Sequence, residues 1–184
     1  MVSQFISPDT VRLLGDLDFD FPEGTHAIGR LDNHSEGLLI LTTNKKVTRL
    51  LFQGPVPHER TYLVRVKNQV SAETLEKLRT GMNIVIEGGA EYITTPCKVN
   101  IVQKPAGLFS GPQEMSDELP HTWLEITLTE GKFHQVRKMV RVAGHRCQRL
   151  IRTSIEDIRL GDLAPGAVRE LGEEEFFRLL KITA

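Results

Sequence analysis

The sequence predicts an α+β protein whose mixed, mainly antiparallel sheet is flanked by helices. Apolar and polar residues alternate through RTYLVRVK (60–67) and HTWLEITL (121–128), the period-two pattern of half-buried β-strands. Short apolar runs at NIVI, EYITT and CKVNIV are separated by Gly or Pro, as in an antiparallel meander. Helical spacing of apolar residues after Gly131 adds an amphipathic helix beside this sheet.

The stretch GRLDNHSEGLLILTTN, residues 29–44, is the one around which we expect the chain to be organised. Its apolar run, 38–41, follows Gly37 and precedes two threonines, which predicts one buried strand. The loop in front of this strand is dense in polar residues, and a loop fixed by a rigid strand is a common place for a functional site. These polar residues are Arg30, Asp32, Asn33, His34, Ser35 and Glu36.

Helix signals frame this stretch on both sides. Residues 11–17 can form a short helical turn. Asn44 is a plausible cap for a helix over KKVTRLLF that ends at Gly54. Ser71 is expected to begin a helix that runs to Gly81.

The carboxyl half contains one long loop and further regular elements. Residues 103–120 are rich in Gly, Pro and Ser, so we expect a flexible loop that is a candidate for RNA contact. In the helix after Gly131, Val136, Met139, Val140 and Ala143 form an apolar stripe opposite His134, Arg137, Lys138, Arg141 and His145. CQRLIRT and EDIRL predict two more strands, and a last helix is expected from Glu173.

The totals are those of an ordinary globular protein. With 184 residues, we expect one domain over 1–184, either compact or bilobed. No apolar run approaches the roughly 20 residues that span a bilayer, so we expect a cytoplasmic monomer without membrane contact. Cys97 and Cys147 form no CxxC pair, and no ligand cluster or Gly-rich phosphate cradle is present, so we expect no metal and no cofactor.

The charge is unevenly distributed along the chain. The net charge of −1 argues at first against a nucleic-acid partner. Residues 131–153, however, contain no acid, and the acids gather near residues 9–23 and 156–175. The cations of 131–153 are Lys132, Arg137, Lys138, Arg141, Arg146, Arg149 and Arg152. A locally basic face on a neutral protein suits an enzyme that binds RNA and then releases it.

Three motifs in order, GRLDNHSEGLLILTTN, RTYLVRV and EGKFHQVRKM, resemble those of the ribosomal RNA pseudouridine synthases. They lie within roughly residues 4–170, and the similarity points to the branch that contains the small-subunit synthase and the large-subunit enzymes B, E and F. The carboxyl half, HTWLEITLTEGKFHQVRKM and RLIRTSIEDIRLGDLAPGAVRE, is most similar to the large-subunit enzyme E. The resemblance implies the pseudouridine synthase fold with a catalytic cleft, and ribosomal RNA, from the large subunit, as the partner. It also implies that 1–184 is one catalytic domain, without the separate RNA-binding module that many relatives carry at the amino end.

The resemblance also implies the catalytic residues. Asp32 would be the essential carboxylate, attacking either carbon 1 of the ribose or carbon 6 of the uracil, or abstracting a ribose proton. Arg137 in HQVRKM corresponds to the family's basic partner of the aspartate. Tyr62 corresponds to the aromatic residue that stacks under the target base, and proton abstraction from carbon 5 is its bolder role, because a phenol is a poor base.

The same resemblance implies a set of RNA contacts. Arg30 would fill the gap left in the RNA stack when the uridine is flipped out. Leu150 would pack against the uracil, although an ordinary core leucine is nearly as good a reading. Arg60 replaces a lysine that is usual in the family and keeps its charge. The cations assigned to phosphates are Lys138, Arg141, Arg146 and Arg149. The loop departs from the family pattern at Asn33, His34 and Ser35.

Two other functions remain open at this point. A hydrolytic glycosidase would use Asp32 and Glu36 as a carboxylate pair, but no aromatic platform for a sugar surrounds them. An RNA-binding module without activity would explain the basic face alone. Asp32, Tyr62 and Arg137 together argue against such a module, because a binder gains nothing from an anion in a cationic cleft.

Overall fold

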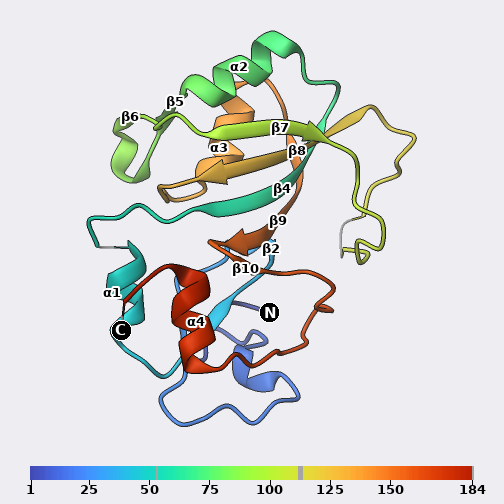
Figure 1. The fold of residues 1–184 in the computed structure, drawn as a ribbon. Helices are drawn as coiled ribbons and strands as arrows, with labels where there is room; N and C mark the ends of the chain where they lie inside the picture. Colours follow the sequence, from blue (N-terminus) through green and yellow to red (C-terminus); the bar gives the residue numbers. More distant parts are fainter. Residues whose placement is uncertain (53, 112–113, 184) are drawn as a thin grey trace.

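A computed structural model describes residues 1–52, 54–111 and 114–183 of the chain (Figure 1). Two one-turn 3₁₀ helices lie at Leu14–Asp16 and Glu87–Gly89. The α-helices are α1 (Val47–Phe52), α2 (Ala72–Thr80), α3 (Gln135–Val142) and α4 (Glu173–Leu180). The strands are β1 (His26–Ile28), β2 (Glu36–Gly37), β3 (Ile40–Thr42), β4 (Arg60–Lys67), β5 (Asn83–Val85), β6 (Glu91–Ile93), β7 (Lys98–Val102), β8 (His121–Leu128), β9 (Cys147–Ile155) and β10 (Ile158–Arg159).

The main sheet has the strand order β10-β9-β4-β8-β7, and all of these neighbours are antiparallel. The short strand β2 pairs with β9 in parallel, which makes the sheet mixed. The predicted α+β class with a mainly antiparallel sheet is therefore confirmed. None of the helices in the described ranges is long and apolar enough to cross a membrane.

The helices that contribute to the two larger apolar clusters lie above and below the sheet as it is drawn in Figure 1. The upper cluster joins α2, α3 and the β5–β6 hairpin to one face of β4 and β8. The lower cluster joins α1 and α4 to β1, β3 and the end of β9. The loop that carries Asp32 leaves β1 and enters β2, so it runs from the lower cluster to the main sheet.

Strand β4 has the predicted bounds, but the prediction that it is half-buried is wrong. Leu63, Val64, Arg65 and Val66 are all buried, so both faces of the strand are covered. The reason is its place between β8 and β9 at the centre of the sheet. Residues 103–120 contribute to this cover, because the buried Arg65 donates hydrogen bonds to the carbonyls of Met115 and Ser116.

The apolar run 38–41 is not the single strand that its composition predicts. Leu38 and Leu39 lie between two strands: β2, which ends at Gly37 and pairs with β9, and β3, which takes up Ile40 and Leu41 and pairs with β1 in a separate two-stranded sheet. Gly37 allows this change of partner: its φ is +104°, and a Cβ there would lie 2.3 Å from the carbonyl oxygen of Arg152. Only glycine lets the two backbones approach so closely.

The predicted meander is likewise divided. Strands β5 and β6 form a hairpin of their own, while β7 joins the main sheet as the partner of β8. The helix predictions agree better with the structure. Ser71 caps α2 by accepting a hydrogen bond from the Thr74 amide, and Asn44 accepts one from the Lys46 amide just before α1. The printed bounds of α1 end at Phe52, and residue 53, which the predicted helix includes before Gly54, lies outside the described residues.

Candidate active site

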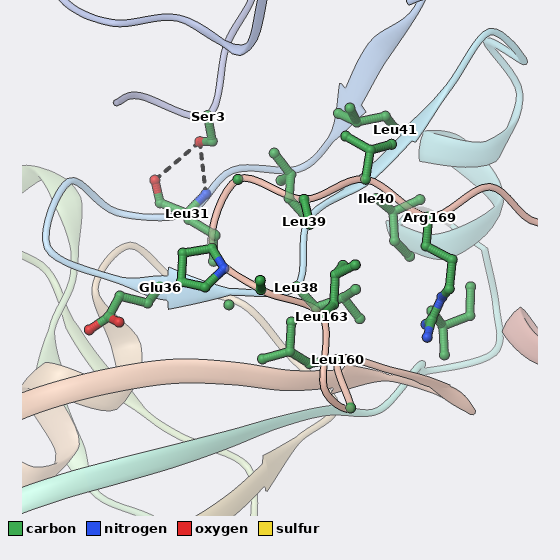
Figure 2. A pocket seen from close by; sticks show the side chains of 18 of the residues that line it. Ser3, Leu31, Glu36, Leu38, Leu39, Ile40, Leu41, Leu160, Leu163 and Arg169 are labelled. Atoms are coloured by element: carbon green, nitrogen blue, oxygen red, sulfur yellow. Dashed lines mark hydrogen bonds between the residues drawn. The ribbon is translucent and has the colours of Figure 1, made fainter. Parts of the chain in front are cut away.

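The Asp32 loop is fixed by backbone contacts. The Ser3 hydroxyl accepts a hydrogen bond from the Leu31 amide (3.0 Å) and donates one to the Leu31 carbonyl (3.2 Å), as Figure 2 shows. The carbonyl of Asp32 accepts a hydrogen bond from the Ser35 amide (2.8 Å), which closes a tight turn. The Asp32 side chain remains 30% exposed, so its carboxylate is held in place and still accessible to a substrate.

Strands β4 and β9 place two further side chains near this carboxylate. Tyr62 is half-buried on β4, and Arg152 is its direct cross-strand partner on β9. Neighbouring side chains on paired strands lie on the same face of a sheet, so a phenol and a guanidinium lie side by side. The predicted site residue Tyr62 thus stands beside a cation that the sequence analysis does not single out.

Arg152 is buried and serves two neighbours. It is 4% exposed, and its Nε donates a 2.8 Å hydrogen bond to the Leu38 carbonyl just after β2. Burial lowers the pKa of the Arg152 guanidinium, while the neighbouring Tyr62 and Asp32 oppose that shift. Arg152 therefore ties the end of the Asp32 loop to β9 and adds positive charge to the site.

His134 also contacts the catalytic candidate. Its Nε2 lies 3.6 Å from Asp32 Oδ1, an ion pair whenever the imidazole is protonated. Helix α3 begins at the next residue, and His134 itself has a left-handed backbone with φ +55°. The sequence signal for this residue is its place in the HQVR motif, but helical periodicity shows it only as one polar residue among several.

A carboxylate network holds the loop that carries His134. Glu130 Oε1 accepts hydrogen bonds from the Thr95 amide (2.9 Å) and from Gln135 Nε2 (2.6 Å). Its Oε2 accepts one from the hydroxyl of Tyr92 on β6, and this contact raises the pKa of Tyr92. Gln135 is buried and accepts a hydrogen bond from the Lys132 amide (2.9 Å). The unusual backbone of His134 is thus flanked by well-bonded neighbours.

The structure does not pair Arg137 with Asp32, in contrast to the role implied by the family resemblance. Its Nη2 donates to the His34 carbonyl and, over 3.3 Å, to the Ser35 hydroxyl. Its Nη1 lies 3.6 Å from Cys147 Sγ. Arg137 therefore braces the turn that follows Asp32. Arg137 bonds there because the turn presents the carbonyl oxygen of His34 to α3.

The remaining predicted residues fall into different environments. Arg30 is exposed on the loop. Arg60 is half-buried at the start of β4 with its guanidinium 5.3 Å from the centre of the Phe52 ring, and burial lowers its pKa. Leu150 is 3% exposed in the upper core cluster, which Tyr62 also contacts. Leu150 thus belongs to the core cluster on which the site residue Tyr62 packs.

The predicted phosphate contacts separate into two groups. Arg141 and Arg146 are exposed and Lys138 is half-exposed, so these cations are available to RNA. Arg149 is 9% exposed: its Nε and Nη2 bond to both oxygens of Glu36 at 3.0 and 2.9 Å, and Nη2 also donates to the Phe109 carbonyl. Arg149 is thus bound by Glu36 and largely shielded from solvent, unlike the other cations to which a phosphate contact is assigned. The same pair occupies Glu36, which leaves the glycosidase reading without a free second carboxylate.

A large cavity lies beside the Asp32 loop but does not contain the whole site. It has a volume of about 1140 Å³, and its lining combines Asp32 with mostly apolar side chains such as Leu38, Leu39 and Leu163 (Figure 2). Tyr62 and His134 do not line it. The reactive side chains meet at the junction of the loop, β4, β9 and the start of α3. Within the described ranges, no three His, Cys, Asp or Glu side chains converge as metal ligands.

Comparison with known proteins gives consistent matches. The family model described as RNA pseudouridylate synthase matches residues 16–141. Ribosomal large subunit pseudouridine synthase E of Vibrio parahaemolyticus is 36% identical over 171 residues, which cover 92% of this chain and 69% of that protein. Ribosomal small subunit pseudouridine synthase A of Escherichia coli is 30% identical over 169 residues, covering 91% of this chain and 64% of that protein.

Solved structures agree with these matches. A crystal structure of a pseudouridylate synthase superposes with a TM-score of 0.68 at 27% identity, covering 88% of this chain and 63% of that one. A chain from a Cbf5-Nop10-Gar1 complex superposes with a TM-score of 0.52 at 11% identity, which shows similarity of fold alone. The chain thus spans about two thirds of the length of its relatives. With its fold, its motifs and more than half of its length matched, the chain belongs to the RNA pseudouridylate synthase family.

Proposed function

We propose that this protein converts a specific uridine in ribosomal RNA, within the large subunit, into pseudouridine. The observation that carries the proposal is Asp32, a fixed and accessible carboxylate that lies 3.6 Å from His134 Nε2 and close enough to Arg152 to interact with its charge. Arg152 in turn is the cross-strand partner of Tyr62. The named function of the relatives, pseudouridine synthesis in ribosomal RNA, supports the choice of reaction and substrate.

The reaction is an internal rearrangement of one nucleotide. The bond between N1 of uracil and carbon 1 of the ribose breaks, the uracil turns while it stays bound, and carbon 5 bonds to carbon 1 of the ribose. Carbon 5 then loses its proton, and N1 carries a proton in the product, so no atom or electron is gained overall. Asp32 supplies the nucleophile or base for the first step, and Tyr62 stacks under the uracil.

RNA binding is assigned to the exposed cations and to the loop. Flipping a stacked uridine into the site costs a few kcal/mol, and Arg30, exposed on the Asp32 loop, fills the space that the base leaves. Lys138, Arg141 and Arg146 bind phosphates around the site, and Arg60 adds charge at the start of β4. Arg137 acts indirectly by bracing the turn after Asp32. We further propose that the chain acts as one catalytic domain, as a cytoplasmic monomer, without metal or cofactor.

The test is modification of transcribed ribosomal RNA that carries tritium at carbon 5 of uridine. Because the new bond forms at carbon 5, each pseudouridine releases one tritium to water, and sequencing then maps the position. We expect release at one large-subunit position, unchanged after EDTA treatment. Release of free uracil instead would support a glycosidase, and RNA binding without tritium release would support a module that only binds.

A further inference from the structure

Phe133 is a large apolar ring placed in solvent at the edge of the active site. It is 58% exposed, although it lies directly before His134 and helix α3. The upper core cluster beneath α3 is formed by other residues, among them Val136, Met139 and Val140. The position of Phe133 therefore needs an explanation other than core packing.

One face of the Phe133 ring is already stacked. The centres of the Phe133 and His134 rings are 3.8 Å apart, and their planes differ by 19°. His134 in turn approaches Asp32 to 3.6 Å. The two rings thus form a short stack that leads from the surface to the carboxylate. The hydrogen bonds of Gln135 to Glu130 and Lys132 hold the loop in this shape.

A cation lies against the exposed ring. Lys138 Nζ is over the Phe133 ring, 5.3 Å from its centre, and residues 131–153 contain no acid, although Asp32 lies 3.6 Å from the stacked His134. An aromatic ring with a lysine over it matches a nucleotide, because the ring stacks with a base when the long lysine side chain moves to bind its phosphate. An apolar protein partner would instead leave the charge of Lys138 and the half-exposed His134 facing an unfavourable surface.

We propose that Phe133 is a stacking platform for the base next to the flipped uridine. This inference rests on the proposed function, and it adds a binding site for a single-stranded nucleotide adjacent to the target. Arg30 fills the gap that the flipped uridine leaves, but it offers no aromatic ring. The Phe133–His134 stack, one side chain away from Asp32, supplies a ring against which one neighbouring base can stack. The platform therefore promotes entry of the uridine by stabilising the RNA on one side of it.

The experiment compares Phe133→Trp, Phe133→Leu and Phe133→Ala with the wild-type protein on tritiated large-subunit transcripts. Trp keeps a ring and should retain affinity and rate, while Leu and Ala should bind the RNA roughly 5- to 100-fold more weakly. Ile101→Ala, which trims a side chain 51% exposed on the edge strand β7, is the matched control and should behave as wild type. Equal behaviour of the Trp and Leu variants would overturn the proposal.

A second measurement separates base stacking from a purely structural effect on His134. Transcripts of the mapped site are made with an abasic residue on either side of the target. One abasic position should weaken binding to wild type and leave binding to Phe133→Ala unchanged. Additive losses would show that Phe133 does not touch that base. An effect seen only on ribosomal subunits and not on transcripts would point to a protein contact and overturn the proposal. If wild type releases no tritium, the proposed function fails before Phe133 is tested.

Discussion

Arg149 and Arg141 look alike in the sequence, and the structure predicts opposite consequences when each is replaced by Ala. Arg149 is buried against Glu36 and the Phe109 carbonyl, whereas Arg141 is exposed on α3. Removing Arg149 leaves a carboxylate and a carbonyl without their donor. Removing Arg141 takes away only a solvated cation.

The magnitudes follow from this difference in burial. Breaking a buried ion pair costs about 3–5 kcal/mol, and the Glu36 side chain is 31% exposed, so water relieves part of the loss. We expect Arg149→Ala to lower the free energy of unfolding by about 2–3 kcal/mol, or Tm by roughly 5–10 °C. Arg141→Ala should change stability by less than about 0.5 kcal/mol.

The assay combines thermal unfolding with RNA affinity at several salt concentrations. Arg141→Ala should reduce the slope of log affinity against log salt by roughly 0.7–0.9, the contribution of one phosphate. Arg149→Ala, measured well below its Tm, should keep the wild-type slope, and Arg149→Lys should be intermediate in stability because it loses the two-point contact. If Arg149→Ala keeps the wild-type Tm and loses salt slope as Arg141→Ala does, the assignment of Arg149 to a structural pair is refuted.

Three further outcomes are expected. Asp32→Asn should abolish tritium release while Tm and RNA affinity stay near wild type; comparable turnover would exclude Asp32 as the catalytic residue. Gly37→Ala should cost at least about 2 kcal/mol in denaturant unfolding, because its Cβ meets the Arg152 backbone, whereas Gly24→Ala meets no atom within 4 Å and should cost less. Burial raises the pKa of Glu156, but the contacts with Lys181, the Glu59 amide and His58 outweigh it, so the pKa in the folded protein is lowered. The ionised Glu156 therefore stabilises the fold above the pKa of the unfolded chain, and this stabilisation is lost as pH falls through the pKa of the folded protein. In Glu156→Gln, the free energy of unfolding should therefore fall less steeply toward acid pH. An unchanged dependence on pH would show that Glu156 does not contribute to the acid sensitivity of the fold.

Patterns among neighbouring residues predict the helices and strands whose bounds do not depend on contacts with distant parts of the chain. The bounds of β4 and the cap of α2 follow from alternation and from Ser71, since both patterns are written in neighbouring residues. The change of sheet between β2 and β3, which interrupts the run 38–41, does not follow, because it depends on Gly37 meeting Arg152 across 115 positions of the chain. The apolar composition of residues 38–41 alone predicts one strand, because it contains no information about this distant contact.

The site shows the same limit for charged residues. Asp32 and Tyr62 are recognised from their motifs, and the structure places both at one junction. The contacts of the arginines are not recognisable, because exposure and partner are set by tertiary packing. Arg137 bonds to a carbonyl, Arg149 to Glu36 and Arg152 to Leu38, and each differs from what a shared basic face implies.

Glu130 has a consequence for slow motions of the molecule. Its carboxylate joins the hairpin strand β6, through Tyr92, to the loop before α3, through Gln135. A transient opening that separates the hairpin from this loop must break both contacts, so we expect the two segments to exchange amide hydrogens together. We therefore expect the contact of His134 with Asp32 to depend on the closed state of the neighbouring hairpin. Substitutions in the hairpin would thus change how long the active site keeps its closed arrangement.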